Sequence, residues 1–203
     1  MKLFKKLAAA VMAAVMSMAL LTGCSGGGGS SVPGTGIVTS FTQKVTLVEV
    51  NDEPYNGLYT EYLTTNGEWM YTEWVTDTQT QANLSWKGGD LYVVNPKNKK
   101  AYKGLSGHPW QTDDTATTTT GTWEYKGKTY RTVEGTTVAD GYKQTQKYCY
   151  DGAKLAYIVT EGMEEGKTTK TVARVDEWSD KADESKLDIN NYTIVNSPDE
   201  LYS

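Results

Sequence analysis

The sequence has little of the chemistry on which most catalytic and metal sites depend. Its 203 residues include one histidine, His108, and two cysteines, Cys24 and Cys149. A single histidine excludes histidine-rich zinc sites and the H-E-x-x-H motif, because both need more than one such ligand. No G-x-S-x-G turn is present to expose a nucleophilic serine. We therefore predict no catalytic residue, no metal site and no cofactor.

Clustered positive charge is also scarce. From residue 24 onward the chain has 17 basic and 25 acidic residues, a formal charge of −8. The basic residues occur only in small groups such as Lys97, Lys99 and Lys100, which are typical of a solvated turn. Nucleic acids and anionic lipid headgroups need clustered Lys or Arg. The composition therefore argues against nucleic acid as a partner.

The N-terminus has the three parts of a secretory signal. Lys2, Lys5 and Lys6 precede an apolar stretch over residues 7–21, which is shorter than the roughly 20 residues of a membrane span. The stretch ends in Leu21-Thr22-Gly23-Cys24, which resembles the lipobox of bacterial lipoproteins. The resemblance implies that residues 1–23 are a signal peptide and that Cys24 carries a diacylglyceryl anchor. It therefore implies a location on the extracytoplasmic face of the cell membrane, and it leaves Cys149 with no partner for a disulfide.

The rest of the chain divides into a tether and one domain. Residues 24–36 hold the lipidated cysteine and a run of Gly and Ser, a composition typical of a flexible linker. From residue 37 to residue 203 the sequence is rich in Thr, Tyr, Trp and Val, which favour strands. We expect this part to be a single β-rich domain.

Closely spaced turn signals divide the domain into strands. Pairs such as Asn66-Gly67 and Asp151-Gly152 supply the positive φ angles that tight hairpins require. No helical segment of 10–15 residues lies between them, so the pattern predicts an antiparallel meander. The predicted strands are 38–50, 57–65, 68–77, 80–87, 90–95, 100–104, 121–126, 128–134, 142–150, 154–161 and 168–178.

Three segments interrupt this pattern. Residues 104–121 form a predicted long loop, of a length that is usually functional or disordered. The charged segment 179–187 could form one or two helical turns. Ser197-Pro198-Asp199-Glu200 has the residue order of a helix start, but only three residues follow it.

The meander resembles the LolA/LolB-type lipoprotein carriers. The resemblance depends on the hairpins over residues 95–102 and 150–157, and on Lys186–Tyr192, which follows a short charged segment and is expected to be a final strand. It implies a curved, half-barrel-like antiparallel sheet whose concave side holds acyl chains or other apolar ligands.

Aromatic residues are the one enrichment with possible functional content. Trp69, Tyr71, Trp74 and Trp86 lie within 18 positions of one another and are the candidate ligand-binding residues. Alternation along a strand places Trp69 and Tyr71 on one face and Trp74 on the other. Of the two subsets we favour Trp69 and Tyr71. Core packing explains most aromatic clusters. The functional alternatives are an apolar binding groove or a surface on which sugar rings stack.

Together these features predict a membrane-anchored lipoprotein that binds an apolar or amphipathic ligand without catalysis. One alternative is a carbohydrate- or protein-binding surface module built as a β-sandwich. A weaker one is a hydrolase that uses acidic residues such as Asp113-Asp114 or Glu164-Glu165. Glycosidases need two carboxyl groups about 5–10 Å apart across a cleft, and sequence spacing does not place such a pair.

Overall fold

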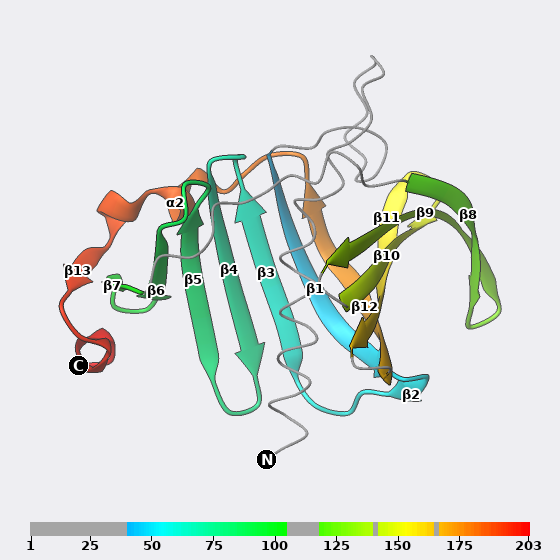
Figure 1. Cartoon of the computed structure of the whole chain (residues 1–203), viewed down its shortest axis with the longest axis horizontal. Coiled ribbons are helices and arrows are strands. Elements are labelled where there is room, and N and C mark those ends of the chain that lie inside the picture. The colour runs from blue at the N-terminus through cyan, green and yellow to red at the C-terminus, as the bar shows by residue number, and fades with distance from the viewer. Residues whose placement is uncertain (1–39, 105–117, 140–141, 165–166) are drawn as a thin grey trace. The chain divides into compact units, whose positions relative to one another are not determined.

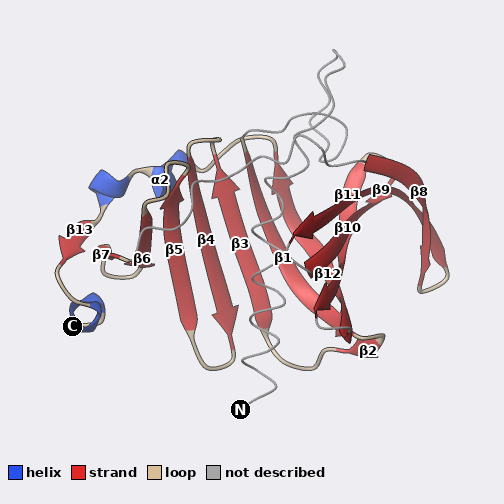
Figure 2. Cartoon of the chain, viewed as in Figure 1, coloured by secondary structure: helices blue, strands red, loops and turns tan. Residues whose placement is uncertain are grey.

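The described part of the chain consists almost entirely of strands (Figure 1, Figure 2). The computed structural model describes residues 40–104, 118–139, 142–164 and 167–203. Its strands are β1 (Phe41–Val50), β2 (Glu53–Pro54), β3 (Tyr59–Thr65), β4 (Trp69–Thr76), β5 (Thr80–Trp86), β6 (Leu91–Asn95), β7 (Lys100–Lys103), β8 (Thr118–Tyr125), β9 (Lys128–Ala139), β10 (Tyr142–Asp151), β11 (Lys154–Glu164), β12 (Lys167–Ser179) and β13 (Thr193–Val195). Its helices are α2 (Glu184–Leu187) and the 3-10 turns η2 (Ile189–Asn191) and η3 (Pro198–Leu201).

The strands form one open sheet. Their order is β13-β7-β6-β5-β4-β3-β1-β12-β11-β10-β9-β8, with β2 paired to β1. Strands β8 and β13 are the two edges, so the sheet does not close into a barrel. The strands are twisted and curved, β8 and β9 most visibly (Figure 1). The predicted all-β class and the predicted curved antiparallel meander are confirmed, and each of the eleven predicted strands overlaps an observed one.

Several hairpin turns occur at positions that the turn signals predicted. Gly67, Gly89 and Gly152 have positive φ angles of 85°, 105° and 61°. At the β8–β9 turn both Lys126 (φ 50°) and Gly127 (φ 75°) are in this region, which matches the right-handed twist of the flanking strands. These residues therefore set the register of the meander.

The described residues belong to two compact units. The β4 unit comprises Thr39–Thr46, Gly57–Trp110 and Asp176–Ser203, and the β10 unit comprises Leu47–Asn56 and Gln111–Val175, in both cases as far as they are described. Each unit has its own apolar cluster on one face of its strands. No helix among the described residues has the length and hydropathy of a membrane span.

The core of the β4 unit lies between the sheet and its C-terminal segment. Tyr71, Leu84 and Val94 are buried on the sheet, and Leu187 of α2 and Tyr192 pack against them. Alternation explains this face, because residues two apart on each strand point to the same side. The C-terminal segment thereby covers apolar side chains that would otherwise contact water.

The core of the β10 unit is largely aromatic. The rings of Trp123, Tyr125, Tyr130 and Tyr157 pack together, with centroid distances from 4.5 to 5.9 Å. Cys149 is fully buried in the same cluster, and burial raises the pKa of its thiol to about 12. The thiol is therefore protonated at neutral pH.

The structure corrects the predicted end of the chain. The strand expected over Lys186–Tyr192 does not form. This segment contains the end of α2 and the 3-10 turn η2, and the last strand, β13, follows at Thr193–Val195. The reason is local capping: Asp183 accepts a hydrogen bond from the Ser185 backbone N–H, and Asp188 accepts one from the Asn190 N–H. The helical turn predicted within 179–187 and the final turn at 197–200 are both present.

The predicted loop 104–121 ends earlier than expected. Strand β8 already begins at Thr118, and residues 105–117 lie outside the described residues. The signal peptide, Cys24, the tether and His108 also lie outside them.

Candidate functional site

The four aromatic residues singled out in the sequence do not share one surface. Trp69 and Trp86 are directly opposite each other on β4 and β5, and Trp86 is 39% exposed. Tyr71 is on the same face but fully buried in the core of the β4 unit. Trp74 is on the opposite face of β4 and is also buried. The structure thus brings Trp69, Tyr71 and Trp86 together and separates Trp74 from them.

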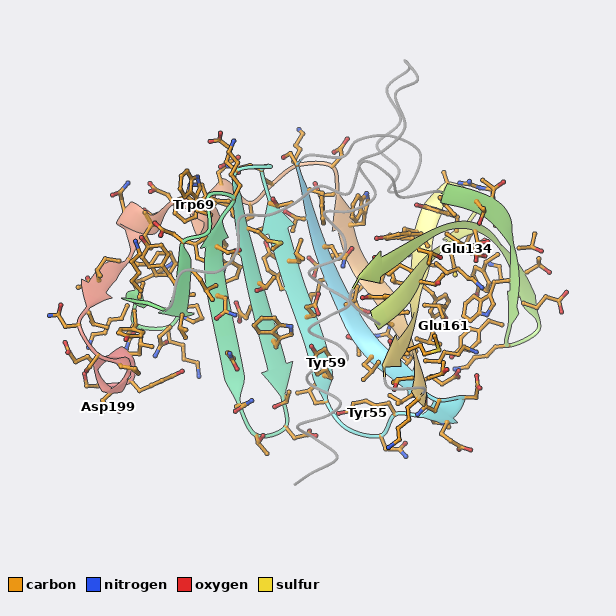
Figure 3. The ribbon with its side chains drawn as sticks, in the orientation of Figure 1. Tyr55, Tyr59, Trp69, Glu134, Glu161 and Asp199 are labelled. Carbon is orange, nitrogen blue, oxygen red and sulfur yellow. The ribbon has the colours of Figure 1, made fainter. Side chains whose placement is uncertain are left out.

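Tyr71 has a structural partner. Its hydroxyl donates a 2.5 Å hydrogen bond to Glu73 Oε2, and its pKa is raised by burial and by this carboxylate. Trp69 packs against the core of the β4 unit, which contains Tyr71. It lies at the end of the β3–β4 pair that is opposite Tyr59 (Figure 3). The Tyr71 hydroxyl is therefore engaged by Glu73.

The face of the β4 unit opposite α2 is the strongest candidate site. Its apolar residues include Phe41 and Val45 on β1, Leu63 on β3 and Trp74 on β4, all buried. These positions alternate with residues that point toward α2. On this face the register aligns Val45 with Glu61 and Trp74, and Gln43 with Leu63 and Thr72, so buried apolar and polar side chains lie next to one another. We call this surface the Glu61 face.

Glu61 lies among apolar side chains of this face. It is directly opposite Val45 on β1 and Trp74 on β4, and it is 2% exposed. Burial raises the pKa of its carboxyl from 4.5 to about 8, and the Trp74 indole offsets part of the shift. Removing a carboxylate from water without a cation is costly, so the carboxyl is mostly protonated at neutral pH. In that form it is a hydrogen-bond donor as well as an acceptor.

Two amide side chains add unpaired polar atoms to the same face. Gln43 is 1% exposed, and neither its Oε1 nor its Nε2 has a hydrogen-bond partner among the described residues. Asn83 Oδ1 on β5 is buried and unpaired in the same way. Nearly all buried polar side chains in proteins find a partner, so each exception needs an explanation. A ligand that supplies the missing donors and acceptors is such an explanation.

Sequence reasoning missed Glu61 and Gln43, although the signal was present. Phe41, Val45 and Leu47 occupy alternate positions of the first predicted strand, and Gln43 lies among them at the same spacing. Glu61 is likewise flanked by Tyr59 and Leu63 on its own face. A polar residue inside an alternating apolar row is the pattern that marks both.

Two other carboxyl groups lie on one face of the β10 unit. Glu134 on β9 and Glu161 on β11 are both labelled in Figure 3. Glu134 Oε1 is 3.5 Å from Lys147 Nζ and accepts a hydrogen bond from Thr132. This carboxylate is therefore engaged within the sheet. No group of three or more metal-ligating side chains occurs among the residues that the structure describes.

Comparisons with known proteins give no family for this chain. No protein-family model matches it, and no curated protein matches it. A structure of PNGF-II is similar over 80% of this chain and 32% of its own, with 10% identity and a TM-score of 0.37. A DUF1329 family protein from Desulfovibrio piger is similar over 71% of this chain and 85% of its own, with 14% identity and a TM-score of 0.28. This chain spans about a third of the PNGF-II chain, and neither likeness is close enough to carry a functional argument.

Proposed function

We propose that this protein is a non-catalytic binding protein for an apolar or amphipathic ligand, which lies on the Glu61 face. The observation that carries the proposal is a buried carboxyl and an unpaired amide at diagonal positions of one sheet face, among buried apolar side chains. The apolar side chains suit a hydrocarbon chain. Glu61 and Gln43 suit a polar group with hydrogen-bonding oxygens, such as a carboxyl or an ester.

The energetics of such a complex are favourable. Each methylene removed from water contributes about 0.8 kcal/mol, so burial of roughly ten would contribute about 8 kcal/mol. That free energy corresponds to a dissociation constant near 1 μM, before the cost of association is subtracted. The polar atoms of Gln43 and Glu61 would then determine the orientation of the ligand rather than the main part of its affinity.

The competing functions have less support from the described residues. The sandwich alternative requires two packed sheets, whereas the described strands form one sheet. A glycosidase requires a second carboxyl about 5–10 Å from the first. Glu61 is the only carboxyl that strands β3, β4 and β5 place on this face.

The test is a lipid titration of full-length Cys24→Ser protein, followed by tryptophan fluorescence with lauric acid and a lysolipid. We expect saturable binding when the Glu61 face is unaltered. Adding Trp74→Ala should lower the affinity at least tenfold. Trp86→Ala is the matched control, because Trp86 lies on the opposite face and is partly exposed. Lauric acid should also bind more weakly above about pH 8, where Glu61 is ionised.

Two outcomes would reject this assignment. One is the absence of any lipid-dependent change in emission from folded protein. The other is binding that is reduced by Trp86→Ala or Trp69→Ala and not by Trp74→Ala, which would place the ligand on the face predicted from the sequence.

We further propose that Cys24 anchors the protein at the extracytoplasmic membrane face through a diacylglyceryl group. Replacing Cys24 with Ser removes the only thiol in the lipobox-like sequence. The variant should therefore incorporate no fatty-acid analogue and should leave the membrane fraction, because stable anchoring requires about two acyl chains. Cys149→Ser, which removes the other cysteine, should label normally. Label that persists in Cys24→Ser would contradict the anchor.

A further inference from the structure

We propose that a charge-lined cavity on the α2 side of the β4 unit binds a compact dipolar ion, with an ammonium group close to a carboxylate or phosphate. The cavity has a volume of about 340 Å³, within the usual size range of small-molecule sites. Its lining residues are Lys44, Thr60, Tyr62, Glu73, Val75, Glu177, Asp183 and Lys186. This site is distinct from the Glu61 face, which lies on the other side of the same strands.

The cavity is built around Tyr62. Lys44 on β1 and Glu73 on β4 are its direct cross-strand neighbours. Asp183, just before α2, accepts a 3.0 Å hydrogen bond from the Tyr62 hydroxyl and also caps α2. Acidic and basic groups therefore surround the ring in fixed positions.

The two ion pairs at this cavity are open. Lys44 Nζ is 3.6 Å from Glu177 Oε1, and Lys186 Nζ is 3.7 Å from Glu73 Oε2. Both distances exceed those of N–H···O hydrogen bonds. By contrast, the surface pairs Lys87–Glu68, Lys103–Asp90 and Lys170–Asp52 are closed at 2.8, 2.9 and 2.6 Å.

The open pairs leave donors and acceptors for a ligand. The side chains of Lys44 and Glu177 make no hydrogen bond to any other described residue. At the more buried end, the side chains of Lys186 and Glu73 are only 26% and 21% exposed. Lys186 Nζ is held 4.9 Å above the Tyr71 ring, and Glu73 is fixed by the Tyr71 hydroxyl. Charge–charge attraction is stronger at such partly desolvated positions than on an open surface.

The charge pattern specifies the class of ligand. Two lysines and three carboxyl groups line the cavity, a formal charge of −1. An anionic group of the ligand would contact a lysine, and its ammonium group would contact Glu73 or Glu177. A dipolar or cationic amino acid fits this pattern, as does the phosphoethanolamine group. A dicarboxylate does not.

The experiment is a titration of full-length, isotope-labelled Cys24→Ser protein, followed by amide chemical shifts. The probes are glycine, L-lysine, phosphoethanolamine and L-glutamate. We expect shifts at the cavity residues of β1, β3, β4 and α2 with at least one of the first three, and weaker binding of L-glutamate. The probe that binds shows whether the natural ligand is an amino acid or carries a phosphoethanolamine group. High salt should weaken the binding of either probe.

Substitutions at the two ends test the geometry. Lys44→Met and Glu177→Gln alter exposed side chains, and each should weaken binding at least tenfold. Lys87→Met, at a closed pair in the same unit, should leave binding unchanged. The absence of cavity shifts with all probes, equal binding of L-glutamate, or no effect of Lys44→Met would overturn the proposal. Lipid binding by the Glu61 face would be unaffected by these variants, so the two proposals fail independently.

Discussion

Replacing Glu61 with Gln should remove a pH-dependent loss of stability of up to about 5 kcal/mol. The carboxyl titrates near its ordinary pKa of 4.5 in the unfolded chain and at about 8 in the folded protein, where burial disfavours its charged form. Each pH unit across this interval corresponds to about 1.4 kcal/mol. Glutamine has nearly the same shape and no charge to bury.

The direction of the effect follows from proton binding. Between pH 4.5 and about 8 the folded protein keeps the Glu61 proton while the unfolded chain has released it. The stabilising effect of this proton is therefore complete below pH 4.5 and is lost progressively as pH rises to about 8. Urea denaturation at several pH values between 5 and 9 should show a declining stability for wild type and a flatter profile for Glu61→Gln.

Glu68→Gln is the matched control. Its side chain is exposed, and the hydrogen bond from Lys87 lowers the pKa of its carboxyl, so the carboxyl is ionised throughout this range. The control should decline with pH in parallel with wild type. Parallel curves for wild type and Glu61→Gln would show that the Glu61 carboxyl is not buried in the way described.

The second large effect is expected from Leu84→Ala. Leu84 is fully buried on β5, directly opposite Tyr71 on β4 and Tyr92 on β6, so truncation removes apolar contacts and leaves a cavity. Such substitutions cost about 2–5 kcal/mol, and for a chain of this size a loss of 3 kcal/mol lowers Tm by roughly 6–12 °C. Differential scanning calorimetry measures the shift directly.

Leu58→Ala removes the same atoms from a different environment. Leu58 precedes β3 and is 43% exposed, so its truncation should change stability by less than about 1 kcal/mol. If the two leucine variants melt at the same temperature, the α2-side cluster is not the core of the β4 unit.

The fold was predictable because short-range rules determine most of it. Alternating apolar residues and Gly-containing turns mark most strands, and a meander then pairs consecutive strands. The pairings of β1 with β12 and of β13 with β7 join strands that are far apart in the sequence, and no turn signal predicts them. The segment after β12 was predicted less well. There the side chains of Asp183 and Asp188 cap short helical turns, and this local bonding prevails over the strand suggested by family resemblance.

The site was predictable only in part. Strand parity correctly separated Trp74 from Trp69 and Tyr71, but it could not tell which face had unpaired polar groups. That property depends on burial of Gln43 and Glu61 by the folded chain. The cavity around Tyr62 also combines β1, β3 and β4 with residues more than 100 positions later in the chain, a proximity that no spacing rule contains.

Native mass spectrometry of the protein extracted from membranes tests the central claim most directly. The account predicts a population carrying a bound lipid-sized molecule, which remains in Trp86→Ala and is lost or much reduced in folded Trp74→Ala. Wild-type protein that is free of such a molecule and takes up none when lysolipid is added would contradict the account.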